Sequence, residues 1–133
     1  MIQNFKIDQT RTFVSLMLIG VIPKLTYGGD TQRQETTKAG VPKWVAQLAA
    51  EFRVFDRSMR ELINVTIDAE KDPGEGLLPG TLMELVDFEI GVMEKRNRAN
   101  DEVVGVQVWY RASAMRPISA TGSRPRPTAA AAG

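Results

Sequence analysis

The chain has 133 residues, 43% of them hydrophobic and 25% charged, which is enough for one domain with one core. Its 17 basic and 16 acidic residues leave a net charge of +1, so any nucleic-acid binding has to come from a local patch. Cysteine and histidine are both absent, which excludes disulfides, thiolate catalysis, Cys/His zinc sites and imidazole acid–base chemistry. We therefore expect no metal and no cofactor, and the lack of cysteine is typical of a cytoplasmic protein.

The first forty residues predict one strand and one polar loop. Residues 1–10 are mixed and indicate a loose lead-in. Residues 13–22 are apolar on both alternating faces, as in a strand buried on both sides, and Gly20 within them indicates a bulge or bend. This run is too short to span a membrane and no small-residue cleavage site follows it, so we interpret it as a strand rather than a signal sequence. Residues 26–40 predict a loop or a loosely paired hairpin.

The segment 42–63 fits two interpretations. Read with period two, Trp44, Leu48 and Phe52 share one face of a strand. Read with a period of 3.6, the same segment makes an amphipathic helix with Pro42 in its first turn. We favour the strand, because a turn-like Gly-Val-Pro precedes it and the flanking sequence predicts β structure.

Three more strands follow, each with alternating side chains. Residues 63–67 predict a half-buried strand. Residues 82–92 predict a long strand on which Leu82, Val86, Phe88 and Ile90 face the core. Residues 104–112 predict the last strand, on which the valines face the core. A charged loop, 94–102, joins these last two strands, and the Ala/Pro-rich residues 119–133 predict a disordered tail.

Five strands in this order predict a mostly β domain over residues 11–118, with the architecture of an OB-type barrel, which is five-stranded and partly open. The alternative is an α+β domain with a helix at 42–63.

The side chains that could carry a function indicate binding rather than catalysis. We find no phosphate loop, nucleophile elbow or metal-ligand spacing, and we expect no enzyme. Single-stranded nucleic acid is held by aromatic rings that stack on bases and by cations that contact phosphates. Trp109 lies on the polar face of the last predicted strand, and we take it as the central candidate. The candidate nucleic-acid-binding residues are Trp109, Arg111 and Gln107 on that strand, Lys95, Arg96 and Arg98 in the hairpin loop, and Tyr27, Lys38 and Lys43 around the first long loop.

A resemblance adds to this interpretation. The stretch 35–47, the strand 63–67, and Leu78-Pro79-Gly80-Thr81 with Phe88 together resemble small proteins of actinobacterial plasmids, phages and integrated elements. Those proteins are similar in outline to OB-fold single-strand-binding proteins. The resemblance implies a role in the replication, transfer or maintenance of DNA of a mobile element. The acidic tip with which housekeeping single-strand-binding proteins end is not present here.

Two function classes remain open. The first is sequence-tolerant binding of single-stranded DNA by a homo-oligomer, with no membrane association. The second is a non-enzymatic protein-interaction or assembly module, such as a phage or plasmid structural or regulatory subunit. Met83, Leu85 and Met93 share the outward register of the fourth predicted strand, and such a surface favours a subunit contact.

Overall fold

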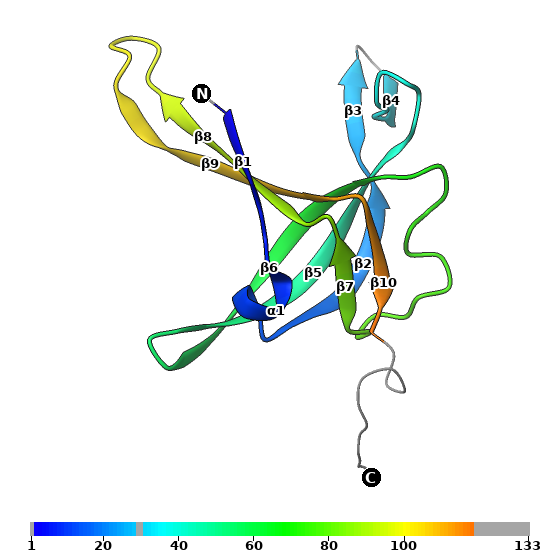
Figure 1. Ribbon diagram of the computed structural model, residues 1–133. Helices are drawn as coiled ribbons and strands as arrows, with labels where there is room; N and C mark the ends of the chain where they lie inside the picture. The colour runs from blue at the N-terminus through cyan, green and yellow to red at the C-terminus, as the bar shows by residue number, and fades with distance from the viewer. Residues whose placement is uncertain (1, 29–30, 119–133) are drawn as a thin grey trace.

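Residues 2–28 and 31–118 are described by a computed structural model (Figure 1). The tail predicted at 119–133 lies outside the described residues. The described chain is mostly β, and its elements are β1 (Ile2–Lys6), α1 (Gln9–Thr12), β2 (Ser15–Pro23), β3 (Leu25–Gly28), β4 (Thr31–Gln34), β5 (Lys43–Val54), β6 (Arg57–Asp68), β7 (Met83–Val86), β8 (Glu89–Arg96), β9 (Val103–Ala112) and β10 (Ala114–Pro117). No helix among the described residues is long and apolar enough to cross a membrane.

The centre of the fold is a curled six-stranded sheet in the order β1-β8-β9-β6-β5-β2. Its neighbours are antiparallel except β6 and β9, which run parallel through Val65–Tyr110, Thr66–Arg111 and Ile67–Ala112. β7 and β10 form a second, two-stranded sheet, and β3 and β4 form a hairpin. The chain around β7 returns to β2, where the Leu18 N–H donates to the Thr81 carbonyl and the Gly80 N–H donates to the Leu18 carbonyl. The curled sheet is therefore a half-barrel that β7 and β10 help to cover (Figure 1).

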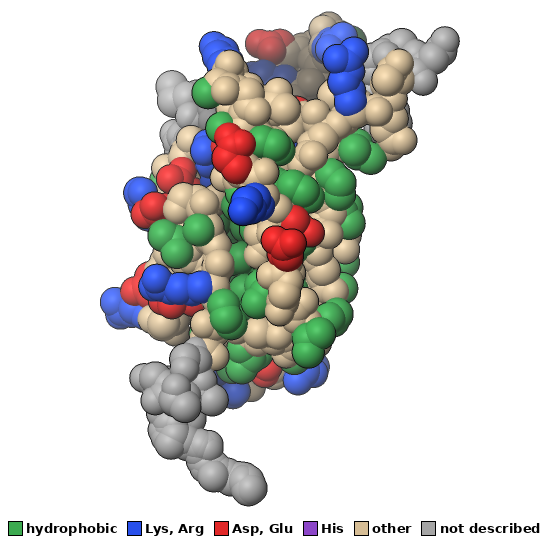
Figure 2. Space-filling model, turned by 90° about the vertical axis from the view of Figure 1, so that its right-hand side faces the viewer, with side chains coloured by type: hydrophobic (Ala, Val, Ile, Leu, Met, Phe, Trp, Pro, Cys, Tyr) green, Lys and Arg blue, Asp and Glu red, His purple; other side chains and the backbone are tan. Residues whose placement is uncertain are grey.

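β2 has the irregularity that Gly20 predicts. Its pairing with β5 shifts register between Leu18 and Gly20. The prediction that this strand is buried on both sides is wrong, since Leu16 and Leu18 are buried while Met17 and Ile19 are exposed. One face packs on the core and the other leaves apolar side chains on the outside. Figure 2 views the molecule from the right-hand side of Figure 1 and shows hydrophobic side chains gathered on it, with charges scattered among them.

The ambiguous segment is a strand. β5 covers residues 43–54 and pairs with β2 on one side and β6 on the other. Ala46, Leu48 and Ala50 are buried with period two, which confirms the strand interpretation and excludes a helix at 42–63. Because β5 lies between two neighbours, its backbone groups are paired along both edges, and this long-range pairing outweighs the local helix pattern.

The long fourth strand predicted at 82–92 is broken in two. β7 ends at Val86 and β8 begins at Glu89, and Asp87 between them has a left-handed backbone with φ of 51°. The irregularity reverses which side chains face inward. Met83 and Leu85 are therefore buried in the core rather than exposed as predicted, and they cannot form a subunit contact. Phe88 is buried as predicted.

The segment 1–10, predicted as a loose lead-in, contains β1 and the start of α1. β1 pairs antiparallel with β8 from Ile2–Met93 to Lys6–Glu89 and forms one edge of the six-stranded sheet. α1 begins after Asp8, whose carboxylate accepts a hydrogen bond from the Arg11 N–H and caps the helix. The first residues of the chain are thus tied to the sheet.

Candidate nucleic-acid interface

Trp109 lies on the outer face of the half-barrel, where β9 crosses between β6 and β8. Alternation along β9 buries Ala112, half-buries Tyr110 and turns Trp109 and Arg111 to the other side. Burial raises the pKa of the Tyr110 phenol, and the nearby Glu61 carboxylate raises it further, so this hydroxyl stays neutral. The sequence prediction that Trp109 and Arg111 share the outward face agrees with this placement.

A small cavity of about 150 Å³ lies beside the Trp109 ring. Its lining consists of Trp109, Arg111, Lys24, Lys43, Thr66 and Asp68, which come from the residue after β2, the start of β5, the end of β6 and β9. Three cationic side chains therefore line the same cavity as the indole ring. Arg111 is exposed, and in the part of the chain that the structure describes its guanidinium makes no ion pair or hydrogen bond. It is available to an anionic ligand.

The two lysines of this cavity are held by one carboxylate. Glu35 lies 3.2 Å from Lys43 Nζ and 3.8 Å from Lys24 Nζ through the same oxygen, Oε2. Both lysines are half-buried, so the shared contact places their ammonium groups together near the indole. Asp68 adds a second carboxylate, one oxygen of which is buried without a hydrogen-bond partner in the described structure. Three cations face two carboxylates at this cavity, and Arg111 also borders a second hollow with Asp68, Asp87 and Glu89.

A wider open groove of about 600 Å³ also borders Trp109. Trp109, Lys24 and Thr66 border both hollows, and the groove adds Val45, Leu62, Asn64, Val108 and other residues of β6 and β9. Its lining combines these apolar side chains with the Asn64 amide, the Thr66 and Tyr110 hydroxyls and the Glu61 carboxylate. An aromatic ring between a cationic cavity and an apolar groove suits a ligand that alternates flat rings with anionic linkers.

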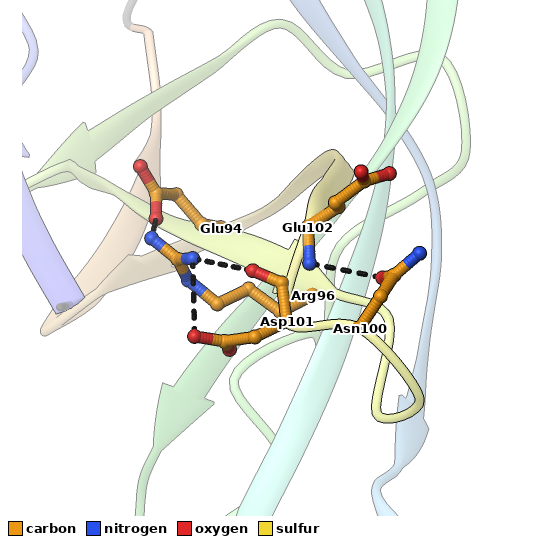
Figure 3. Close-up of polar contacts among 5 residues, drawn as sticks. All are labelled: Glu94, Arg96, Asn100, Asp101 and Glu102. Atoms are coloured by element: carbon orange, nitrogen blue, oxygen red, sulfur yellow. Dashed lines mark hydrogen bonds and ion pairs between the residues drawn. The ribbon is translucent and has the colours of Figure 1, made fainter.

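The cations of the β8–β9 hairpin lie away from this cavity. Arg96 is occupied within its own hairpin: it lies 2.8 Å from the Glu94 carboxylate and 3.8 Å from the Asp101 carboxylate, and it donates to the Asp101 carbonyl (Figure 3). Lys95 and Arg98 are exposed and line no described cavity. The hairpin extends beyond the half-barrel as an arm (Figure 1). Of the three predicted hairpin cations, two are therefore unpaired in the described structure.

Of the remaining predicted residues, some lie at or near the cavity and others lie away from it. Lys43 lines the cavity as expected, and Gln107 is exposed one alternate position from Trp109. Lys38 is exposed in the turn at 37–40 and lines neither hollow. The side chain of Tyr27 lies outside the described residues. Trp44, which the strand interpretation places toward the core, is half-buried, and its indole N–H donates to the Ala69 carbonyl at 2.9 Å.

Lys24, Thr66 and Asp68 belong to the cavity but not to the predicted set. Lys24 follows β2, and its position beside Trp109 depends on the pairing of β5 with β6 and of β6 with β9. No local pattern in the sequence encodes the parallel β6–β9 contact. Thr66, directly across from Arg111, could be found only once that register is known.

The described residues contain no group of three or more His, Cys, Asp or Glu side chains that could hold a metal ion. The molecule is thus a mostly β half-barrel with an aromatic and cationic hollow on its outer face. No family model, curated protein or solved structure matches the chain.

Proposed function

We propose that this protein binds single-stranded DNA, with little sequence preference, through the face that carries Trp109. The observation that carries the proposal is the Trp109 ring set between Arg111, Lys24 and Lys43 at the edge of an open groove. Base stacking on an aromatic ring is tolerant of sequence because every base has a π-face, and cations beside the ring neutralise phosphates. Binding, rather than catalysis, is the proposed activity.

The strand order supports an OB-type barrel as the scaffold. Counting β2, β5, β6, the bent strand β7/β8 and the bent strand β9/β10 as five strands, the second lies beside the first and third, and the fifth lies between the third and fourth. The pairing of Met17 with Leu82 brings the fourth back to the first. Such barrels bind oligonucleotides on the face of strands two and three, between the loop after strand one and the loop after strand four.

The proposed interface occupies that position. Val45 and Lys43 come from the second strand and Thr66 and Asn64 from the third. The β3–β4 hairpin follows the first strand, and the β8–β9 arm joins the fourth to the fifth. Lys38 and the unpaired arm cations Lys95 and Arg98 would then contact phosphates farther along the strand. We extend the proposal to a role in replication, transfer or maintenance of DNA, with a mobile element as the candidate that the resemblance indicates.

The test is a titration of fluorescently labelled oligo-dT, followed by anisotropy, at low and at moderate salt, beside a duplex of the same length. We expect single-strand binding that weakens with salt and a preference over the duplex. Trp109→Ala should weaken it ~5- to ~150-fold, since one stacked base contributes about 1–3 kcal/mol.

Phe55→Ala is the matched control, because Phe55 is an aromatic residue that is 94% exposed at the β5–β6 turn and lines neither hollow. It should bind like the unchanged protein. Absence of binding to any strand at low salt would contradict the proposal.

A second candidate function is a homo-oligomeric assembly module, and one observation favours it. Beyond the barrel, the face of β9 that continues from Tyr110 presents Val104, Val106 and Val108 at 47–61% exposure. β1, at the edge of the sheet beyond β8, adds Phe5 at 50%. Antiparallel pairing of two β1 strands across a two-fold axis would set both apolar strips on one continuous sheet. Val108 belongs to both this strip and the proposed groove, whereas Val104, Val106 and Phe5 lie outside the groove lining.

A further inference from the structure

Gly91 lies directly beneath the Trp109 ring. The two residues are partners across the β8–β9 pair, and Gly91 is the buried residue of a strand whose other members are half-buried or exposed. A methyl group on the Gly91 Cα would overlap Cε2, Cζ2 and Nε1 of the indole, all inside 3.0 Å. The indole therefore rests against the β8 backbone in a space that no other amino acid leaves free.

Glycine is unfavourable inside a strand unless another group needs the space that a side chain would fill. It has no side chain to pack and weakens the strand, so an interior glycine often marks a close approach by another group. Gly105, on β9 of the same hairpin, has nothing within 4 Å of the position of its missing Cβ. A side chain at position 91 would therefore collide with the Trp109 ring, whereas one at position 105 would begin in open space.

We propose that Gly91 is a positioning residue that lets Trp109 lie flat as a stacking platform for a nucleic-acid base. This inference rests on the proposed function. With one side of the ring against β8, the ring borders the cationic cavity and the apolar groove together. A side chain at position 91 would lift the ring off the sheet and move it away from the three cations.

The platform also specifies where one nucleotide sits. The cationic cavity of about 150 Å³ is lined by Arg111, Lys24 and Lys43, so it is the place beside the ring that suits a phosphodiester group. A base on Trp109 therefore has its phosphate between Arg111 and the two lysines, and the neighbouring nucleotides follow the wider groove.

The test compares Gly91→Ala with Gly105→Ala as the matched control, together with Trp109→Ala and the double variant Gly91→Ala/Trp109→Ala. We expect Gly91→Ala to weaken oligo-dT binding by about the same factor as Trp109→Ala, ~5- to ~150-fold, and Gly105→Ala to bind normally. Because Gly91 acts through the ring, the double variant should lose no more affinity than Trp109→Ala alone. Near-ultraviolet circular dichroism should change in Gly91→Ala and not in Gly105→Ala.

Normal affinity in Gly91→Ala, or additive losses in the double variant, would overturn the inference. If Gly91→Ala does not fold, recovery of folding in the double variant supports the overlap with the ring, and failure of the double variant contradicts it. If the unchanged protein binds no strand, the proposed function fails, while the circular dichroism of the two alanine variants still decides whether Gly91 positions the ring.

Discussion

The side chain of Gln9 makes two hydrogen bonds to the backbone of β7, as a neighbouring strand would. Gln9 Nε2 donates to the Met83 carbonyl and the Leu85 N–H donates to Gln9 Oε1, both at 2.9 Å and both partly buried. Gln9→Leu removes both partners and leaves a carbonyl and an N–H without hydrogen bonds. We expect the free energy of unfolding, measured in urea, to fall by about 1–3 kcal/mol. Gln107→Leu, at an exposed position of β9, is the control and should change it little. Equal unfolding curves for the two variants would contradict this role of Gln9.

The charge of Arg111 should be visible in the salt dependence of binding. Arg111 is exposed beside Trp109 and has no ion-pair partner in the described structure, so it is free to neutralise one phosphate. Arg111→Gln should lower affinity for oligo-dT and reduce the slope of log K against log salt by about 0.7, the value for one phosphate on a single strand. Arg57→Gln, at the exposed β5–β6 turn, should leave the slope unchanged. A drop in affinity with an unaltered slope would mean that Arg111 does not contact phosphate.

At the scale of an element, the β5–β6 hairpin contains a turn that its residues disfavour. Val54 pairs with Arg57, so Phe55 and Asp56 form a two-residue loop, with φ of 50° and 65°. Both angles positive define a type I′ turn, which Asn-Gly fits best and a bulky side chain fits poorly. Replacing Phe55→Asn and Asp56→Gly should raise the free energy of unfolding by about 1 kcal/mol. Phe55→Ala/Asp56→Ala keeps the steric conflict and should give no such gain in thermal unfolding. An equal gain in both would refute the turn argument.

The same scale explains which strands could be predicted from the sequence. β5 could be predicted because Ala46, Leu48 and Ala50 lie at alternate positions and the flanking sequence predicts β structure. The break between β7 and β8 could not be predicted, because it depends on the left-handed backbone of Asp87, which alternating hydrophobicity does not reveal. This one residue reverses which alternate positions face the core. The odd-numbered Met83 and Leu85 are therefore buried before it, and the even-numbered Phe88 is buried after it.

For the whole molecule, local patterns predicted the mostly β class and the outward position of Trp109. They did not predict the partners of β9. The last strand reads as a uniform core strand, yet only Ala112 on its inner face is buried and the valines beyond Tyr110 are exposed. β9 pairs with β6 only from Tyr110 to Ala112, and its earlier residues pair with β8 alone, so the valines lie outside the half-barrel. For the same reason the sequence did not predict Lys24 in the cavity, since only the assembled sheet brings it to Trp109.

The exposed valines lead to a prediction about assembly. An apolar strip on an arm that extends from the barrel, beside the edge strand β1, is the surface on which a second copy would gain most buried area. We expect the purified protein to sediment as a dimer or larger species, with the fraction rising with concentration. Val106→Lys places a charge within the strip and should shift it to monomer.

Gln107→Lys places the same charge on the opposite face of the same strand and is the matched control for assembly. It should leave the sedimentation coefficient unchanged. Because Trp109 lies on that opposite face, the Val106→Lys monomer should keep its single-site affinity for a short oligo-dT. On a long strand it should bind less tightly, since a dimer engages two segments at once and gains from effective concentration. A protein that is monomeric at every concentration would contradict the two-fold arrangement while leaving the Trp109 interface to be judged by its own titration.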